Sequence, residues 1–442
     1  MLFEIVILIF ILLLMISRVA ITSTASLHGP HFFPIMFFLI FGMLQLLTIA
    51  THDNTFTIEL FGVEDARNVI KNGSTYYFCC LIVYVFCSQV INIDKFKFSV
   101  NEIDLTKPHY PQIFVTGWCV LVISALATLY YINSADRSIF ESIISPQKIY
   151  FENDGANTSY TSNGYLVVMA GLSSIYSYVL YGYVCYFNAV LRRRDWILLA
   201  LNILVYILFC IVTSSRGYIF SFAMTFFIMR SAVGRPIPFF RFIVAIFSFF
   251  VLFVIISASR DDVDLSEAAG LMLITIGLYS GGATIFNTSL IYSYFEPSNL
   301  YHGVTFLWLL AAPIPRYFWP EKPLVALDEI VARDVHGYND AAFHTTPPGV
   351  FGELYMNFGN FGGLIALLVI VLVYLKVIQK IQNKCASKSA TFLLFLIYCA
   401  AVSRLFYAFL SSSINFTLMN FLITFSQIYV IVYVAQFRRK FR

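Results

Sequence analysis

Long apolar runs separated by short polar connectors make up almost the whole chain. A helix that crosses a membrane needs about 20 mostly apolar residues, because the hydrocarbon core is about 30 Å thick and each residue adds about 1.5 Å. By this criterion the sequence predicts one group of spans before residue 260 and a second group after residue 359. The first group lies near 1–22, 32–51, 75–93, 112–133, 164–190, 196–213, 217–232 and 242–258, and the second near 360–378, 391–410 and 414–435.

Two further apolar stretches between these groups leave the number of crossings open. Residues 268–295 are uncharged but rich in glycine, and residues 303–315 are apolar but short. They form either a pair of broken crossings or a re-entrant or interfacial segment. The chain is therefore predicted to have 11 or 13 spans, and we slightly favour 13.

The composition is that of a membrane protein, with 59% hydrophobic and only 12% charged residues. Soluble globular proteins carry roughly twice that charged fraction. We therefore expect an all-α polytopic integral membrane protein in which residues 1–442 form a single membrane domain in contact with membrane lipids. The formal net charge of +4 is small, and the cations lie in short connectors, which argues against nucleic acid as a partner.

The lysine and arginine clusters predict the orientation, because such residues concentrate in the cytoplasmic connectors of membrane proteins. These clusters comprise Arg192, Arg193 and Arg194; Arg230, Arg235 and Arg241; Lys376, Lys380, Lys384 and Lys388; and the terminal Arg438, Arg439, Lys440 and Arg442. With them on the cytoplasmic side, the connectors at 52–74, 134–163, 214–216, 259–267 and 316–359 face outward.

The longest polar interruption, residues 296–359, is predicted to be the segment that bears the functional site, and it includes the short apolar stretch 303–315. It holds three of the seven histidines, His302, His336 and His344. Connectors that only join helices can be short and featureless, and this one is neither.

Three arginines outside this segment are expected to lie at or near the outward membrane face. Arg216 lies in the SSRG tip of the hairpin 196–232, whose helices together are about 55 Å long, slightly less than the roughly 60 Å of two crossings, so the tip should lie at or just beneath the outward membrane surface. Arg404 is embedded in an apolar run, and Arg260 tops another span. Each could bind an anion such as a lipid-linked phosphate. The alternatives are snorkelling to headgroups for Arg216, a structural salt bridge for Arg404, and a surface ion cluster for Arg260.

The stretch PIPRYFWPEKP places Arg316, Lys322 and Trp319 on a stiff backbone, since it has four prolines in eleven residues. Cations beside aromatic rings suit the binding of a phosphorylated sugar. They equally suit an aromatic belt at the membrane boundary.

His344 and Glu353 are the candidate proton acceptors of the segment, because a histidine, or a partly desolvated glutamate, titrates near neutral pH. Each is otherwise a satisfied polar residue. The histidine spacing matches no zinc motif, so no metal site is predicted. The sequence also lacks GxxxxGK[ST] and GxSxG, so no cofactor is expected and the energy for any reaction must come with the substrate or from a gradient.

The motifs SSRG, HG-x-TF, IPRYFWPEKP and TTPPGVFGELYMNFGNFGG, all within 214–363, resemble those of Wzy-type oligosaccharide repeat-unit polymerases of bacterial polysaccharide synthesis. The resemblance implies an inner-membrane glycosyltransferase of type C character. Such an enzyme joins undecaprenyl-diphosphate-linked repeat units, into O-antigen or into capsular or exopolysaccharide, on the periplasmic face. It further implies that outward arginines, here Arg216, Arg316 and Arg260, bind the diphosphates. O-antigen ligases look similar and use a histidine in a large outward loop, which His344 would match.

The sequence therefore supports a polymerase in which Arg216, Arg316 and Arg404 bind diphosphate with help from Lys322. His344 or Glu353 would act as base, and Tyr355, Asn357 and Trp319 would contact the glycan. A flippase and a chain-length regulator are the expected protein partners. The alternatives are an O-antigen ligase and a polytopic transporter or flippase. A transporter would be expected to have paired broken helices in two matching halves.

Overall fold

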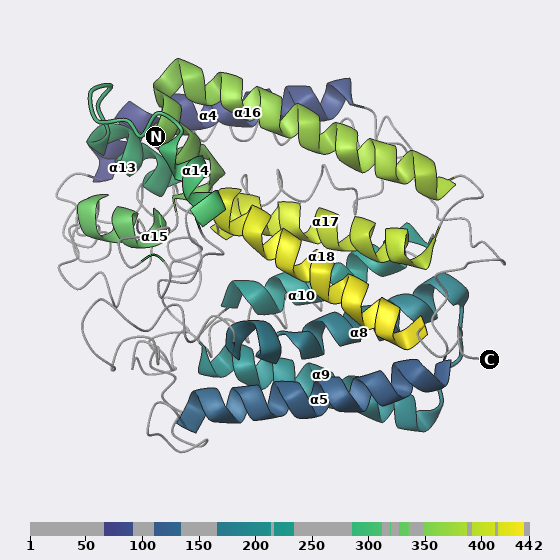
Figure 1. Ribbon diagram of the computed structural model, residues 1–442. Helices are drawn as coiled ribbons and strands as arrows, with labels where there is room; N and C mark the ends of the chain where they lie inside the picture. The colour runs from purple at the N-terminus through teal and green to yellow at the C-terminus, as the bar shows by residue number, and fades with distance from the viewer. Residues whose placement is uncertain are drawn as a thin grey trace. The chain divides into compact units, whose positions relative to one another are not determined.

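The computed structural model describes ten stretches of the chain (Figure 1). These are residues 66–91, 110–133, 166–213, 216–233, 285–311, 319, 327–335, 348–386, 391–411 and 414–436. Nearly all of them are helical and none forms a strand, so the predicted all-α class is confirmed for this part of the chain. The spans predicted at 1–22, 32–51 and 242–258 lie outside the described residues.

Five of the described helices are long and apolar enough to cross a membrane, which supports the predicted membrane protein. They are Asn68–Ser88, Tyr110–Asn133, Leu166–Phe187, Arg193–Val212 and Gly349–Lys384. Two shorter apolar helices, Phe392–Ser403 and Asn420–Gln436, follow near the end of the chain. The helices α5 (Tyr110–Asn133), α9 (Arg193–Val212), α17 (Phe392–Ser411) and α18 (Ile414–Gln436) all begin and end within a few residues of their predicted bounds.

The chain is divided into two compact units, each made of separate stretches of sequence. Unit 1 comprises residues 1–95, 269–379 and 405–419, and unit 2 comprises 96–268, 380–404 and 420–442. A hydrophobic pattern cannot reveal this division, because it marks helices and not the partners that each helix packs against.

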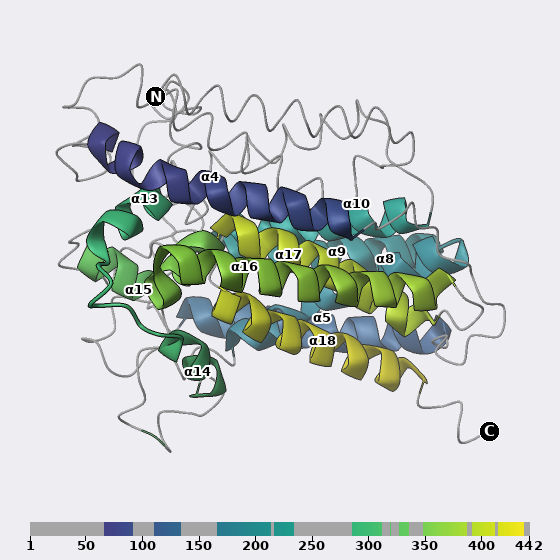
Figure 2. The ribbon, with the colours of Figure 1, turned by 90° about the horizontal axis from the view of Figure 1, so that it is seen from above.

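Unit 2 contains α5, α8 (Leu172–Phe187), α9 and α10 (Arg216–Ala232), which lie side by side in Figures 1 and 2. Helices α5 and α9 are parallel. Tyr110 at the start of α5 bonds to Asp195 at the start of α9, and Tyr131 near the end of α5 packs on Val212 at the end of α9. This is the arrangement expected of two crossings that are separated by one further crossing, here the helical segment Leu166–Phe187.

Buried serines join α5 to the helical segment that contains α8. The Ser124 hydroxyl donates to the Met169 carbonyl at 3.0 Å and accepts from the Ser173 amide at 3.1 Å. Small hydroxyl side chains let helices approach closely and hydrogen-bond where the surroundings are apolar. Helix α10 packs on its neighbours through Phe222, whose ring lies 4.9 Å from that of Tyr206 and 5.2 Å from that of Tyr178.

Unit 1 is built on α4 (Ala66–Val90), α13 (Ile285–Tyr294) and α16 (Gly349–Ala386). The Tyr76 hydroxyl donates to the Phe351 carbonyl at 3.3 Å, and the Cys87 thiol donates to the Leu368 carbonyl at 4.0 Å. The contact later in α4 is thus also the later one in α16, so the two helices run in the same direction (Figure 2). The predicted alternation of crossings gives the spans near 75–93 and 360–378 this same polarity.

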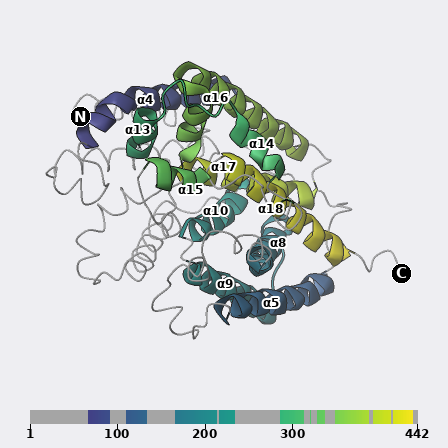
Figure 3. The ribbon, with the colours of Figure 1, turned by 60° about the vertical axis from the view of Figure 1, so that its left-hand side comes forward.

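Helix α16 is broken at Gly359, whose φ of 67° and ψ of −163° lie in a region that only glycine adopts without strain. The break divides α16 into a first limb, 349–358, and a second limb, 360–386, which run in different directions (Figure 3). The predicted span 360–378 coincides with the second limb. The first limb falls in the segment predicted to be an outward connector, and its residues 349–357 are all buried. A 10-residue limb is too short for a criterion based on about 20 apolar residues to detect.

Gly363 lets the two limbs approach each other. A Cβ atom there would overlap the Tyr76 hydroxyl and lie 3.1 Å from the carbonyl oxygen of Leu354 in the first limb. Gly363 thus leaves room for the Tyr76 hydroxyl, which donates to the Phe351 carbonyl of the first limb.

The described parts of the two ambiguous stretches are short helices. Helix α13 has 10 residues and α14 (Val304–Ala311) has 8, or about 15 Å and 12 Å of length. The prediction of 11 or 13 spans also depends on 268–284 and 312–315, which lie outside the described residues. In the predicted connector 316–359, the short helix α15 (Leu327–Ile330) leads into the π-helical turn η1 (Val331–Val335).

Replacing Gly359 with alanine should lower the stability of the protein by about 1–3 kcal/mol, because alanine is strained at this φ and ψ. The new Cβ would also lie 3.1 Å from Leu300 Cδ1. Gly171→Ala is the matched control, since Gly171 has a right-handed φ of −65°. Thermal unfolding of the detergent-purified variants measures the effect. Equal unfolding midpoints for the two variants would contradict the proposed strain.

Candidate functional site

Asn357, near the end of the first limb of α16, bonds to a connector more than 50 residues earlier in the chain. Its Oδ1 accepts from the Gly303 amide at 3.1 Å and from the Thr305 hydroxyl at 3.0 Å. Its Nδ2 donates to Thr305 Oγ1 at 2.8 Å and to the Glu353 carbonyl at 2.8 Å. Asn357 has no exposed surface. Both ends of a buried amide are thus satisfied, as the cost of burying one requires.

Two neighbours of Asn357 hold the same connector. The Met356 carbonyl accepts from the Tyr301 amide at 2.9 Å, and the Tyr355 hydroxyl donates to the Phe295 carbonyl at 3.2 Å. Consecutive residues 355–357 therefore bind residues 295–305, and we call this set of bonds the 355–357 clamp. Met356 lies among the last four residues of the first limb, whose carbonyls lack a helical donor at such a break. In the clamp, the Tyr301 N–H supplies the missing donor to the Met356 carbonyl.

The clamped connector turns at His302 and Gly303, whose φ values of 49° and 84° are both left-handed. Two such residues in succession reverse the direction of the chain. A positive φ is uncommon for a residue other than glycine, such as His302. The turn leads directly into α14, where the Phe306 ring stacks on Phe358 at 5.9 Å. This explains the HG-x-TF motif: Gly303 and Thr305 bond to Asn357, and Phe306 packs on the residue after it.

Glu353 caps a helix. Its side chain is fully buried, and a carboxylate oxygen accepts the backbone N–H of Ile414, the first residue of α18. The first N–H groups of a helix have no partner within it and carry partial positive charge, so a carboxylate there is stabilising. The predicted role of Glu353 as a general base stays a prediction. In the structure the carboxylate positions the start of α18.

Three tyrosines form an aromatic cluster that includes Tyr355 of the clamp, and two of them, Tyr76 and Tyr355, are buried. The ring centroids of Tyr76 and Tyr355 are 5.1 Å apart, those of Tyr292 and Tyr355 4.8 Å, and those of Tyr76 and Tyr292 6.3 Å. The cluster joins α4, α13 and the first limb of α16. Sequence reasoning missed Tyr76 and Tyr292, because a tyrosine in an apolar run carries no sign of its partner.

Aromatic rings continue along the connector to a more accessible part of unit 1. The Tyr301 ring lies 5.7 Å from Phe295 and 5.8 Å from Trp308. Burial raises the pKa of the Tyr301 phenol and the Asp334 carboxylate raises it further, while Arg333 lowers it. The Tyr301 phenol is therefore neutral near pH 7, where it can donate a hydrogen bond.

Arg333 and Asp334 of η1 provide charge beside Tyr301. They form an exposed ion pair in which Arg333 Nε lies 2.6 Å from Asp334 Oδ1. Half-buried rings beside polar and charged groups suit contact with the rings and hydroxyl groups of sugars.

The structure brings three of the predicted site residues together. Glu353, Tyr355 and Asn357 share the first limb, and all three are buried. Their observed bonds position the connector and α18, so the glycan contacts predicted for Tyr355 and Asn357 stay predictions. Trp319 is 40% exposed. Two predicted residues lie in described helices but their side chains are not described: Arg216 at the start of α10 and Arg404 within α17. The other four, Arg260, Arg316, Lys322 and His344, lie outside the described residues.

Comparisons with protein-family models, with characterised proteins and with solved structures find no match to this chain.

Replacing Thr305 with valine should destabilise the clamp by about 1–3 kcal/mol, because the buried Asn357 amide loses a donor and an acceptor. Amide hydrogen exchange should become faster at residues 301–305, and the unfolding midpoint should fall. Thr128→Val is the control, since Thr128 is equally buried but bonds only to the carbonyl of Ser124 in its own helix. If the control lowered the midpoint as much as Thr305→Val, the clamp would have no special role.

Proposed function

We propose that this protein polymerises undecaprenyl-diphosphate-linked oligosaccharide repeat units into polysaccharide at the periplasmic face of the bacterial inner membrane. The observation that carries the proposal is the direct bonding of two motifs that resemble those of repeat-unit polymerases. HG-x-TF, at 302–306, and GE-x-Y-x-NFG, at 352–359, are joined by Asn357 through Gly303 and Thr305. Motifs that meet in space form one scaffold, as parts of a single site must.

The clamp also defines where the intervening polar segment, 312–347, begins and ends. Residue 311 lies six residues after Thr305, and residue 348 lies nine before Asn357, so both ends of the segment leave one bonded scaffold. Closing a loop in advance reduces the entropy lost when its side chains bind a ligand. The segment carries Arg316, Trp319, Lys322 and His344. We therefore infer that the clamp presents these residues to the substrate.

The reaction is transfer of a glycan from its lipid diphosphate to a hydroxyl of the next lipid-linked unit. The acceptor oxygen bonds to the anomeric carbon, the bond from that carbon to the diphosphate oxygen breaks, and a base takes the hydroxyl proton. His344 or Glu353 would accept the proton. The proposed arginines, Arg216, Arg316, Arg404 and Arg260, with Lys322, would stabilise the charge that develops on the leaving diphosphate.

One observation favours a different class of function. Transporters use helices broken near the middle of the membrane to bind substrates, and α16 is broken at Gly359. The transporter alternative requires a matching break in a second half of the protein. Among the described helices of unit 2, none has a backbone break of this kind.

Replacing Arg216 or Arg316 with alanine should abolish long-chain polysaccharide while leaving the amount of protein unchanged, because the diphosphate loses a guanidinium partner. Gel separation of the polysaccharide from a strain carrying each variant measures chain length. Lysine at the same positions should restore part of the activity, since the charge returns without the bidentate geometry. Acceptors capped with one repeat unit identify loss of a polymerase, whereas bare acceptors would indicate a ligase. Unchanged chain length would reject the proposed roles.

Two substitutions at Glu353 separate its observed and its proposed roles. Glu353→Gln keeps an oxygen that can accept the Ile414 N–H but cannot take a proton at neutral pH. If Glu353 only caps α18, this variant should fold and polymerise nearly as well as the native protein. If Glu353 is the base, it should fold and yet lose activity by about 100-fold or more. Glu353→Ala leaves the buried Ile414 amide without its acceptor, so the yield of folded protein should fall in either case.

A further inference from the structure

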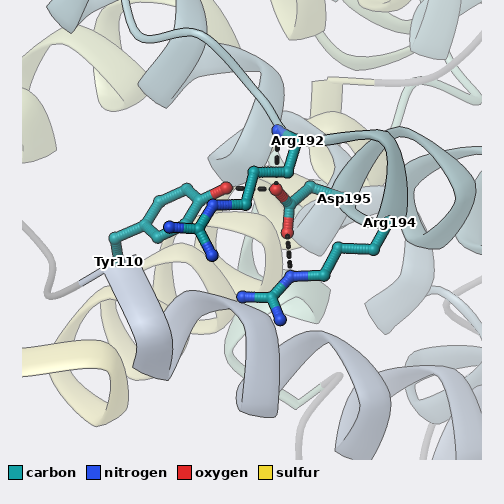
Figure 4. A network of polar contacts seen from close by, with 4 residues as sticks. All are labelled: Tyr110, Arg192, Arg194 and Asp195. Atoms are coloured by element: carbon teal, nitrogen blue, oxygen red, sulfur yellow. Dashed lines mark hydrogen bonds and ion pairs between the residues drawn. The ribbon is translucent and has the colours of Figure 1, made fainter.

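Asp195 at the start of α9 organises a cluster of polar groups in unit 2 (Figure 4). It is only 2% exposed, and its Oδ2 accepts from the Tyr110 hydroxyl and from the Arg192 amide, the latter at 2.9 Å. Its Oδ1 lies 3.8 Å from Arg194 Nε. A single buried carboxylate thus ties the start of α5 to the start of α9 and anchors the arginine connector between α8 and α9.

The cluster holds more positive charge than Asp195 neutralises. The three arginines at 192–194 are exposed. Among the described residues, no carboxylate other than Asp195 forms an ion pair with any of them. The guanidinium groups of Arg192 and Arg194 extend to the same side of Asp195, toward α5 (Figure 4). Two guanidinium groups beside each other suit an anion with several oxygen atoms.

Arg194 is held in place before any ligand arrives. Its Nε faces Asp195, and its guanidinium carbon lies 4.6 Å from the ring centroid of Phe114 on α5. An ion pair and a cation–π contact together restrict an otherwise flexible side chain. The terminal nitrogens of the guanidinium group can then bind phosphate oxygens in the bidentate geometry that arginine favours.

Apolar side chains on the same two helices indicate that the anion belongs to a lipid. Candidate spans begin at Tyr110 and Arg193, so the arginines lie at the end of two membrane helices. Below them α5 exposes Val115 and Trp118, and α9 exposes Trp196 and Ile197. Tryptophan concentrates at the membrane boundary, and exposed apolar faces accommodate acyl chains. A free phosphate ion would gain nothing from these faces.

We propose that Arg192 and Arg194, positioned by Asp195, bind the phosphodiester headgroup of an anionic phospholipid, whose acyl chains lie along the exposed faces of α5 and α9. Arg193 adds charge to the site. This role is independent of the proposed polymerase activity. It differs from a general effect of positive charge on topology, because it requires the particular geometry that Asp195 and Phe114 impose.

Native mass spectrometry of the detergent-solubilised full chain, titrated with phosphatidylglycerol or phosphatidylcholine, tests the site. The protein should retain phosphatidylglycerol in preference to phosphatidylcholine. The double variant Arg192→Gln with Arg194→Gln should bind phosphatidylglycerol about tenfold more weakly, since charge-assisted hydrogen bonds are lost. The matched control is Lys380→Gln with Lys384→Gln, which removes the same charge from two exposed lysines near the end of α16 and should change binding less than about twofold.

Equal weakening in both double variants, or equal retention of the two lipids, would overturn the proposal in favour of nonspecific attraction. If the glutamine variant does not fold, Arg192→Lys with Arg194→Lys provides the test, because it keeps the charge and removes the bidentate geometry. Unaltered phosphatidylglycerol binding by the lysine variant would then reject the site. Competition by inorganic phosphate at millimolar concentration separates the two sources of anion. Full displacement of the lipid would show that the site recognises phosphate alone and would overturn the assignment to a lipid.

Discussion

The need to satisfy every buried backbone group within the protein is the constraint on which unit 1 depends. A membrane offers no water to a broken helix, so irregular backbone is tolerated there only where protein groups replace the missing partners. Helix α16 is broken at Gly359, and the connector before α14 turns through two left-handed residues. Each irregularity exposes donors or acceptors that the other satisfies, through Met356 and Asn357. The break and the turn are therefore parts of one structure.

The same constraint assigns a structural reason to residues that a motif search would class as catalytic. In the stretch GELYMNFG, the glutamate caps α18, the tyrosine and asparagine bond to the connector, and the last glycine adopts a conformation reserved for glycine. In our proposal the chemistry then falls mainly to the segment 312–347, whose ends the scaffold holds.

Unit 2 uses polar groups differently. Most polar side chains of its described helices bond to carbonyls of the same helix or join two neighbouring helices. Asp195 differs, because it is a buried charge that faces Arg194 and lies close in sequence to Arg192 and Arg193 at the start of a span. A buried carboxylate needs such partners to offset the loss of hydration. The arginines beside it have charge to spare, and this excess is what suits the site to an anionic ligand.

The sequence by itself determined the class of the protein and most of the described spans, because about 20 apolar residues in a row have few alternatives to crossing a membrane. Helices α5, α9, α17 and α18 accordingly lie where the hydrophobic pattern places them. The tertiary structure alone decided that 349–358 is a buried half-helix, that Asn357 bonds to Gly303 and Thr305, and that Glu353 caps α18. Hydropathy reports on one stretch of chain at a time, whereas each of these features depends on a partner more than 50 residues away. Packing specifies such a partner, and a local sequence pattern does not identify it.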